Sequence, residues 1–179
     1  MFYVSEIFRT APASFKTPLE EKVYQAFERL GIEYERVDTD PGITMEDCQN
    51  IDKVLGDRIV KTIFLCNRQQ TKFYIYATRD DKPFVTKDFG RALGIPRVSF
   101  ADAGHLMNIA GVEHGATTVL SACLDSTKDV TFVFDQDVIS NEHFSCTDGT
   151  ATCFVKLKTS DLLDRFMKAF GSDIRIIGV

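Results

Sequence analysis

The order of hydrophobic and polar positions along the chain predicts a series of helices with clear starts and ends. The first opens at residues 17–20 (TPLE), which have the form of a capping box with proline at the first helical position. Val23, Phe27 and Leu30 follow at helical spacing, and Gly31 supplies an end signal. The same kinds of signal predict helices over residues 44–56, 86–94 and 159–170, and another that ends at Gly111.

Strands are predicted where β-branched and aromatic residues concentrate or alternate with polar ones. Residues 59–65 and 72–77 are separated by a polar stretch of the kind that closes a hairpin. Because helices and strands interleave irregularly, with hairpins and crossovers, the order predicts an α+β fold with a mixed, curved β-sheet flanked by helices. Further strands are predicted over residues 32–37, 97–100, 130–134, 151–157 and 174–177.

Length and composition favour a single globular domain over residues 1–179. The chain is 44% hydrophobic and 26% charged, which excludes disordered and collagen-like proteins. Residues 1–16 show no clear period, and we expect them to form an N-terminal arm that packs on the body. No apolar run approaches the roughly 20 residues of a membrane span, and no basic region followed by an apolar stretch opens the chain. We therefore expect a cytoplasmic protein with no membrane partner.

The charge of the chain is uneven. Its net charge of −5, from 21 Lys and Arg against 26 Asp and Glu, argues against broad binding of nucleic acid and of DNA in particular. Basic residues nevertheless concentrate between positions 58 and 97. This stretch is either a solvated face or a place where an RNA backbone docks despite the negative total. Its basic members are Arg58, Lys61, Arg68, Lys72, Arg79, Lys82, Lys87, Arg91 and Arg97.

The chain carries no common cofactor or metal motif. It has no phosphate loop, dinucleotide fingerprint, nucleophile elbow or metalloprotease helix, so we expect no cofactor. Its five cysteines include no C-x-x-C pair, which argues against structural zinc and favours reduced thiols. No cysteine has an evident base partner in the sequence, so we assign the thiols mainly to packing.

Two residues stand out as candidates for chemistry. Lys61 lies in the otherwise apolar stretch 59–65, either on a solvated face or aimed into a cleft to bind a phosphate or carboxylate. His114 lies in a loop bounded by Gly111 and Gly115, where it is either an ordinary loop residue or a titratable group in a site.

Several short stretches together resemble the YbaK and prolyl-tRNA synthetase-associated domain family of aminoacyl-tRNA deacylases. The resemblance extends from about Thr17 to Val179, and it is the combination of the stretches that is specific. The stretches are residues 60–68 (VKTIFLCNR), 72–74 (KFY), 82–84 (KPF), 93–94 (LG), 97–101 (RVSFA), 111–115 (GVEHG) and 159–163 (TSDLL).

The resemblance implies hydrolysis of a mischarged tRNA in trans, typically alanyl-tRNA(Pro), without a metal or a covalent nucleophile. Lys61 matches the family lysine and would hold the terminal adenosine phosphate or ribose. The loop Gly111–Gly115, with His114, would cradle the aminoacyl group. The implied partner is the acceptor end of an aminoacyl-tRNA, and prolyl-tRNA synthetase is a second candidate partner.

The chain departs from the family pattern at polar positions. The asparagine after the family lysine is Thr62, the proline of the glycine loop is His114, and Thr147 and Ala151 align with a late histidine and asparagine. These changes leave open a diverged paralogue that binds tRNA or a synthetase without turnover, and a deacylase for another charged tRNA such as cysteinyl-tRNA(Pro). The remaining expected substrate-binding residues are Arg97, Ser99, Asp148 and Thr152.

Overall fold

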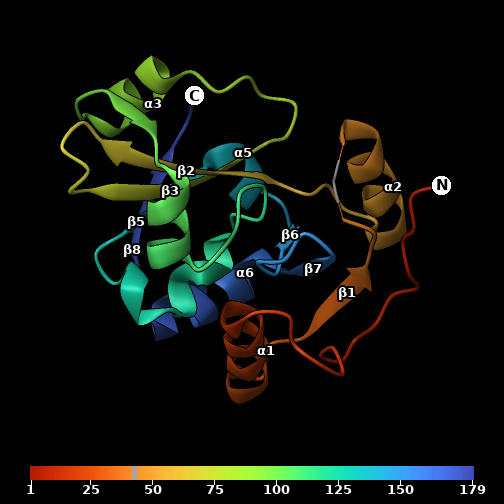
Figure 1. Cartoon of the computed structure of the whole chain (residues 1–179). Coiled ribbons are helices and arrows are strands. Elements are labelled where there is room, and N and C mark those ends of the chain that lie inside the picture. The colour runs from red at the N-terminus through yellow and green to blue at the C-terminus, as the bar shows by residue number, and fades with distance from the viewer. Residues whose placement is uncertain (42–43) are drawn as a thin grey trace.

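The computed structural model describes residues 1–41 and 44–179 and has two β-sheets with helices packed around them (Figure 1). The larger sheet has five strands in the order β4-β2-β3-β5-β8, and the smaller has three in the order β1-β7-β6. The predicted α+β class is therefore confirmed, with the strands divided between two sheets. The strands are β1 (Tyr34–Asp38), β2 (Lys61–Asn67), β3 (Phe73–Thr78), β4 (Val98–Phe100), β5 (Thr131–Asp135), β6 (His143–Thr147), β7 (Cys153–Lys158) and β8 (Asp173–Ile177).

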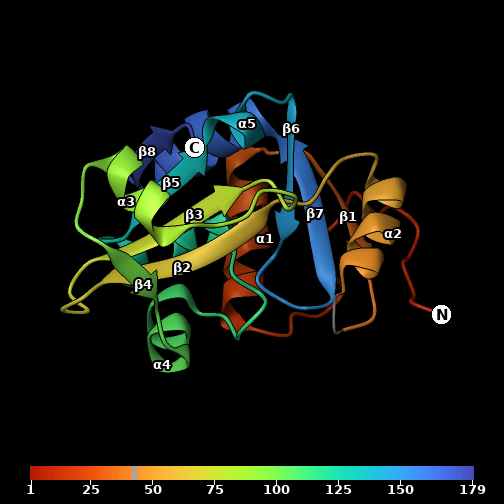
Figure 2. The same cartoon turned by 90° about the horizontal axis from the view of Figure 1, so that it is seen from above.

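The larger sheet is mixed, as the sequence predicts. Strand β2 is antiparallel to β3 and β4, whereas β5 is parallel to β3 and β8. The smaller sheet is antiparallel throughout and, with α2, lies at the end of the molecule away from the tip of the β2–β3 hairpin (Figures 1 and 2). An isolated parallel bridge between Ile59 and Ser145 joins the start of β2 to β6 and so links the two sheets.

The two longest helices begin and end where their capping residues predict. Helix α1 starts after Thr17, whose side chain accepts a hydrogen bond from the Glu20 N–H, and stops at Gly31 in the left-handed conformation. Helix α2 starts with a reciprocal capping box between Thr44 and Asp47. The helical elements are α1 (Pro18–Leu30), α2 (Met45–Leu55), α3 (Thr86–Leu93), α4 (Ala103–His105), η1 (Leu106–Ala110), η2 (Val119–Cys123), η3 (Asp125–Thr127), α5 (Gln136–Ile139), α6 (Thr159–Asp161) and η4 (Leu162–Met167).

Both faces of the larger sheet are covered by apolar side chains. One face contributes Phe64 and Phe134 to the main core, which also contains Phe27 of α1. The opposite face contributes Tyr76 to a second core that contains Phe89 of α3. Each large apolar side chain buried in this way contributes roughly 1.5–3 kcal/mol. The sheet is thereby fixed between α1 on one side and α3 on the other.

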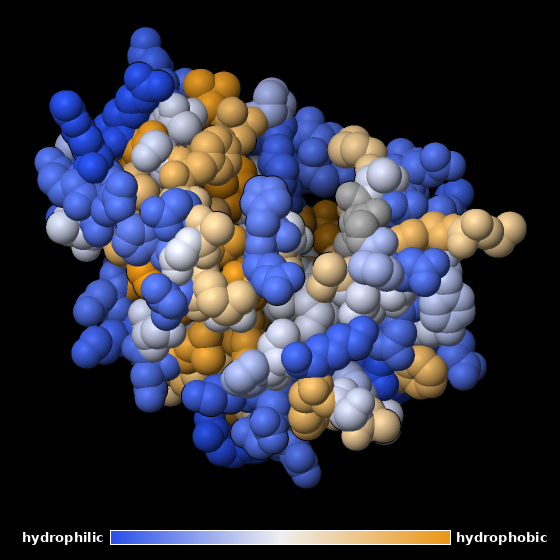
Figure 3. Space-filling model, viewed as in Figure 1, coloured by the Kyte–Doolittle hydropathy of each residue, from blue (hydrophilic) through white to orange (hydrophobic). Residues whose placement is uncertain are grey.

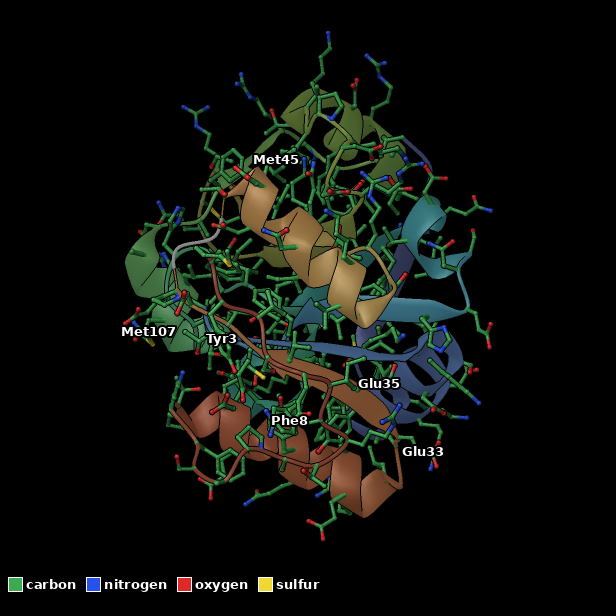
Figure 4. All side chains as sticks on the ribbon, turned by 90° about the vertical axis from the view of Figure 1, so that its right-hand side faces the viewer. Tyr3, Phe8, Glu33, Glu35, Met45 and Met107 are labelled. Atoms are coloured by element: carbon green, nitrogen blue, oxygen red, sulfur yellow. The ribbon has the colours of Figure 1, made fainter. Side chains whose placement is uncertain are left out.

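The N-terminal residues lie along β1, where Figure 4 labels Tyr3 and Phe8. The backbone of Phe8 exchanges two hydrogen bonds with Arg36, of 2.9 and 2.8 Å. The Arg36 guanidinium also lies over the Phe8 ring, 4.8 Å from its centroid. These contacts extend the smaller sheet at its β1 edge.

The structure differs from the sequence-based expectation in several places. Strand β6 was not predicted, and the two last predicted helical segments have π-helical stretches at Leu106–Ala110 and Leu162–Met167. The predicted capping box of α1 is half formed, because the Glu20 side chain accepts from the Lys16 N–H, at 2.7 Å, instead of from Thr17.

Candidate functional site

The start of β2 lies beside the end of β6, so that two predicted site segments meet. The Val60 N–H donates to the Ser145 carbonyl at 2.9 Å, in the parallel arrangement of the Ile59–Ser145 bridge. Because the two segments run in the same direction, residues 61 and 62 follow on one side of the bridge and Thr147 on the other. The fold therefore brings together positions more than 80 residues apart in the sequence.

Lys61 is half-buried at the start of β2. It lies opposite Thr78 in the β2–β3 pair, and residues paired in this way project to the same face of a sheet. That face is the one covered by α3. The Lys61 Nζ donates a hydrogen bond to the backbone carbonyl of Lys82. The ammonium is thus held in one place while its other two N–H bonds stay available for a ligand.

Thr62 projects to the other face of the sheet. It lies opposite Ala77, which belongs to the main core together with Val112 and Ala116 of the glycine loop. Thr62 is half-buried at this position. Lys61 and Thr62 therefore flank the start of β2 from opposite sides, with Thr62 on the side of the loop.

The glycine loop, residues 111–115, is shaped by backbone conformations that favour glycine. Gly111 has φ +70°, and a Cβ there would lie 2.8 Å from Leu124 Cδ1. Gly115 has φ +88°, and the following Ala116 N–H donates to the Glu113 carbonyl at 3.1 Å. Between them His114 is exposed. The loop presents backbone groups and one imidazole to solvent.

The turn between β6 and β7 packs against this glycine loop. Gly149 has φ +99°, and a Cβ there would lie 2.6 Å from Leu19 Cδ2 and 3.6 Å from Val112 Cγ1. Within the turn, the Thr147 hydroxyl donates to the Thr150 carbonyl and accepts from the Gly149 N–H. Leu19 of α1 also borders Gly111. One leucine therefore fixes the spacing between the turn and the loop.

Figure 3 shows a hollow on the face of the molecule that is viewed in Figure 1, between the region of the glycine loop and α2, with hydrophobic residues at its floor.

Beneath the turn lies a buried acidic cluster that sequence reasoning missed. The ligand atoms of Glu20, Asp148 and Cys153 lie within 4.8 Å of one another. Asp148 accepts hydrogen bonds from the Tyr24 hydroxyl at 2.8 Å and from the Thr150 hydroxyl at 2.7 Å. Burial, followed by the hydrogen bond and negative charge of Asp148, raises the pKa of Glu20 to about 7. Glu20 thus keeps its proton up to near neutral pH.

This acidic cluster has the donor types of a metal site, but its geometry is explained without one. Both Asp148 oxygens already accept hydrogen bonds, and burial raises the pKa of the Cys153 thiol far above the range in which it ionises. Glu20 was not predicted as a site residue, because an acidic residue in the first turn of a helix normally serves to cap the helix. Only the alignment of α1 with the β6–β7 turn reveals its role.

The cysteines of the main core are poor nucleophiles. Burial raises the pKa of Cys123 and of Cys146 to about 12 in each case. No disulfide joins the five cysteines, all of which lie in the described residues. This agrees with the assignment of the thiols to packing.

Two predicted substrate-binding residues lie away from the seam. Ser99 pairs with Cys66, four residues beyond Thr62 along β2 and therefore roughly 13 Å away. Arg97 is exposed and lines a groove with Arg68 and Lys72 at the β2–β3 hairpin. The structure thus separates these two side chains from Lys61. A third, Thr152, accepts a hydrogen bond from the Lys16 ammonium.

The structure is an α+β domain in which the start of β2, the glycine loop and the β6–β7 turn lie near the junction of the two sheets. Comparison with known families is specific: residues 39–165 match the model of the aminoacyl-tRNA editing domain. The match covers more than half of the chain, so the chain belongs to this family, as the sequence resemblance predicted.

Individual relatives agree with this assignment. The chain is 25% identical over 158 residues to the prolyl-tRNA editing protein ProX of Acetoanaerobium sticklandii, covering 88% of this chain and 96% of that protein. It is 27% identical over 160 residues to prolyl-tRNA synthetase associated domain-containing protein 1 of Danio rerio, covering 88% and 84%. A solved structure described as a trans-editing enzyme for prolyl tRNA synthetase superposes with a TM-score of 0.66 at 14% identity, covering 93% of this chain and 99% of that chain.

Among the described residues, no helix is both long and apolar enough to cross a membrane.

Proposed function

We propose that this protein hydrolyses a mischarged aminoacyl-tRNA in trans, with alanyl-tRNA(Pro) as the preferred substrate. The observation that carries the proposal is the position of Lys61 at the seam of the two sheets. Its ammonium is fixed by the Lys82 carbonyl, and the next residue, Thr62, lies on the side of the sheet that faces the glycine loop. The family assignment supplies the reaction class.

The proposed roles follow from the chemistry at each side of the seam. Lys61 binds the terminal adenosine phosphate or ribose as a localised cation. The backbone of Gly111 and Gly115 cradles the ester carbonyl, with Thr62 and His114 as adjacent polar groups. Because the ester is already activated, positioning a water molecule and the carbonyl accounts for the catalysis.

Thr147 and Asp148 act in this proposal by holding the turn. Their side-chain oxygens are engaged within the turn and the buried acidic cluster. Arg97 and Ser99 lie farther along the sheet, where they would contact the tRNA away from its aminoacyl end, and Thr152 lies beside the turn. Arg97 is suited to a phosphate because it is exposed and lies with two other cations.

The test is single-turnover deacylation of tRNA(Pro) charged with alanine, cysteine or serine. We expect release of alanine to be fastest, and we expect Lys61→Ala to reduce its rate at least ~100-fold. Lys168→Ala is the matched control, because Lys168 is exposed on the last helix, outside the proposed site. Equal rates for wild type and Lys61→Ala would refute the role of Lys61. Preferential release of cysteine would replace the alanine assignment.

A non-catalytic binder is the second candidate, favoured by the departures at Thr62, His114 and Ala151. In that case tRNA binding would persist without turnover of any of the three charged tRNAs. Repeating the assay with added prolyl-tRNA synthetase tests the proposed second partner. A rate unchanged by the synthetase would show that the protein acts independently of it.

A further inference from the structure

Lys82 connects the proposed site to the interior of the protein. It lies between β3 and α3, and its ammonium donates to three oxygens. These are Asp135 Oδ2 at 2.7 Å, Asp137 Oδ2 at 2.8 Å and the Val179 carbonyl at 2.6 Å. An ammonium has three hydrogens, so all of them are used. All three ammonium hydrogens of Lys82 are therefore used in contacts within the protein, and no hydrogen is left for a ligand.

The first of these acceptors, Asp135, is completely buried at the end of β5. Its Oδ2 also accepts from the hydroxyls of Tyr76 at 3.2 Å and Thr78 at 3.0 Å, and its Oδ1 accepts from the Asp137 N–H at 3.0 Å. A buried carboxylate with this many donors has one well-defined orientation. Asp135 thus gives Lys82 a rigid attachment point.

The backbone of Lys82 faces the other way, toward the seam. Its carbonyl accepts the hydrogen bond from Lys61 Nζ described above. One residue therefore links a buried carboxylate, through its side chain, to the site lysine, through its backbone. Thr78 is the β-sheet partner of Lys61, and its hydroxyl also donates to Asp135. Lys61 is therefore connected to the Asp135 carboxylate in two ways, through Lys82 and through Thr78.

We propose that Lys82 and Asp135 are positioning residues that fix the ammonium of Lys61 in one place at the start of β2. This inference rests on the proposed function. A lysine side chain has four flexible methylene groups, so an unanchored Lys61 would sample many positions. The anchored carbonyl of Lys82 selects one of them. Neither Lys82 nor Asp135 has to touch the substrate for this effect.

Activity measurements test the inference first. Lys82→Met removes the ammonium that anchors residue 82. The double variant Lys82→Met/Asp135→Asn also removes the charge of the Asp135 carboxylate, so that no unpaired charge is left in the interior to destabilise the fold. We expect each to slow single-turnover deacylation by about 10- to 100-fold, at unchanged folded fraction by circular dichroism. In a Lys61→Ala background, the same changes should alter the residual rate less than about twofold. Equal losses in both backgrounds would show a structural effect only and would overturn the inference.

A second measurement needs no substrate and separates this inference from the proposed function. Acetylation of Lys61 by an amine-reactive ester is followed by peptide mass spectrometry, with Lys168 as the internal reference. We expect both variants to acetylate Lys61 severalfold faster than wild type, because its ammonium is released from the carbonyl. An unchanged rate would overturn the anchoring even if the wild type deacylates tRNA. If both variants are acetylated faster at Lys61 and the wild type shows no deacylase activity, the anchoring stands and only the proposed function is contradicted.

Discussion

Two aspartates, Asp135 and Asp148, are both completely buried, yet the protein stabilises them in different ways. Asp135 lies on the α3 side of the larger sheet and is paired with the cation of Lys82. Burial alone would raise the pKa of Asp135, but hydrogen bonds from Lys82, the Asp137 N–H and Thr78 outweigh it and lower the pKa. Asp148 lies near α1 and has another acid, Glu20, as its neighbour.

The difference shows that burial does not determine the charge of a carboxyl group by itself. Beside a lysine the buried acid stays ionised, whereas Glu20, beside a second carboxylate, retains its proton up to near neutral pH. The ion-paired network holds the Lys61 ammonium through the Lys82 carbonyl. The buried acidic cluster lies beneath a turn that contacts the glycine loop through Leu19. Each of these two segments is thus supported by its own kind of buried polar group.

The largest effect is expected from breaking the ion-paired side. Asp135→Ala leaves Lys82, Tyr76 and Thr78 without their common acceptor, and should lower the free energy of unfolding by about 3 kcal/mol. Asp137→Ala is the control, because its carboxylate is half-exposed and contacts the same lysine. Urea denaturation of both variants measures the difference. Comparable losses would mean that burial of Asp135 is unimportant.

The pH dependence of this contribution has a definite sign. The folded-state pKa of Asp135 is lowered, so its stabilisation is complete above the unfolded-state pKa of about 4. It is lost as the pH falls through the lower folded-state value. The difference in stability between wild type and Asp135→Ala should therefore be constant above neutral pH and shrink in acid.

An intermediate effect is expected from disturbing the turn on the other side. Gly149→Ala places a Cβ 2.6 Å from Leu19 in a left-handed backbone, and should cost about 2–3 kcal/mol. Gly115→Ala has the same kind of backbone strain with no neighbour within 4 Å, and should cost about 1 kcal/mol. Thermal unfolding of the two variants separates strain from packing. Identical losses would mean that contact with Leu19 adds nothing.

The smallest effect at neutral pH is expected from Glu20→Gln, and the effect depends on pH. The folded state raises the pKa of Glu20 to about 7, so the folded protein holds a proton that the unfolded chain releases at about 4.5. Stability should therefore fall as the pH rises from about 4.5 to 7, by up to about 3 kcal/mol. Glu20→Gln should remove this slope, and the exposed neighbour Glu21→Gln should retain it. An unchanged slope in Glu20→Gln would contradict the raised pKa of Glu20.

Much of the fold could be predicted because its signals are local. The cap at Thr17, the glycine at position 31 and the apolar spacing between them determine α1 without tertiary information. Strand β6 could not be found in this way, because it is only five residues long and its buried positions include Ser145 and Thr147, which are polar.

The candidate site was predictable only in part for the same reason. Lys61 is conspicuous as a charge inside an apolar strand. Glu20 and Asp135 are not, since acids are common in the first turn of a helix and at the end of a strand. Their roles depend on residues far away in sequence, Asp148 for one and Lys82 for the other. Pairing of that kind is a property of the tertiary structure.

The bridge between Ile59 and Ser145 has a consequence for the order in which the candidate site assembles. The bridge closes a loop of more than 80 residues, so it forms late relative to local contacts such as the β2–β3 hairpin. During synthesis the seam cannot exist until β6 has left the ribosome. A nascent chain that ends before residue 145 would carry Lys61 and the glycine loop but would have no assembled place in which to use them.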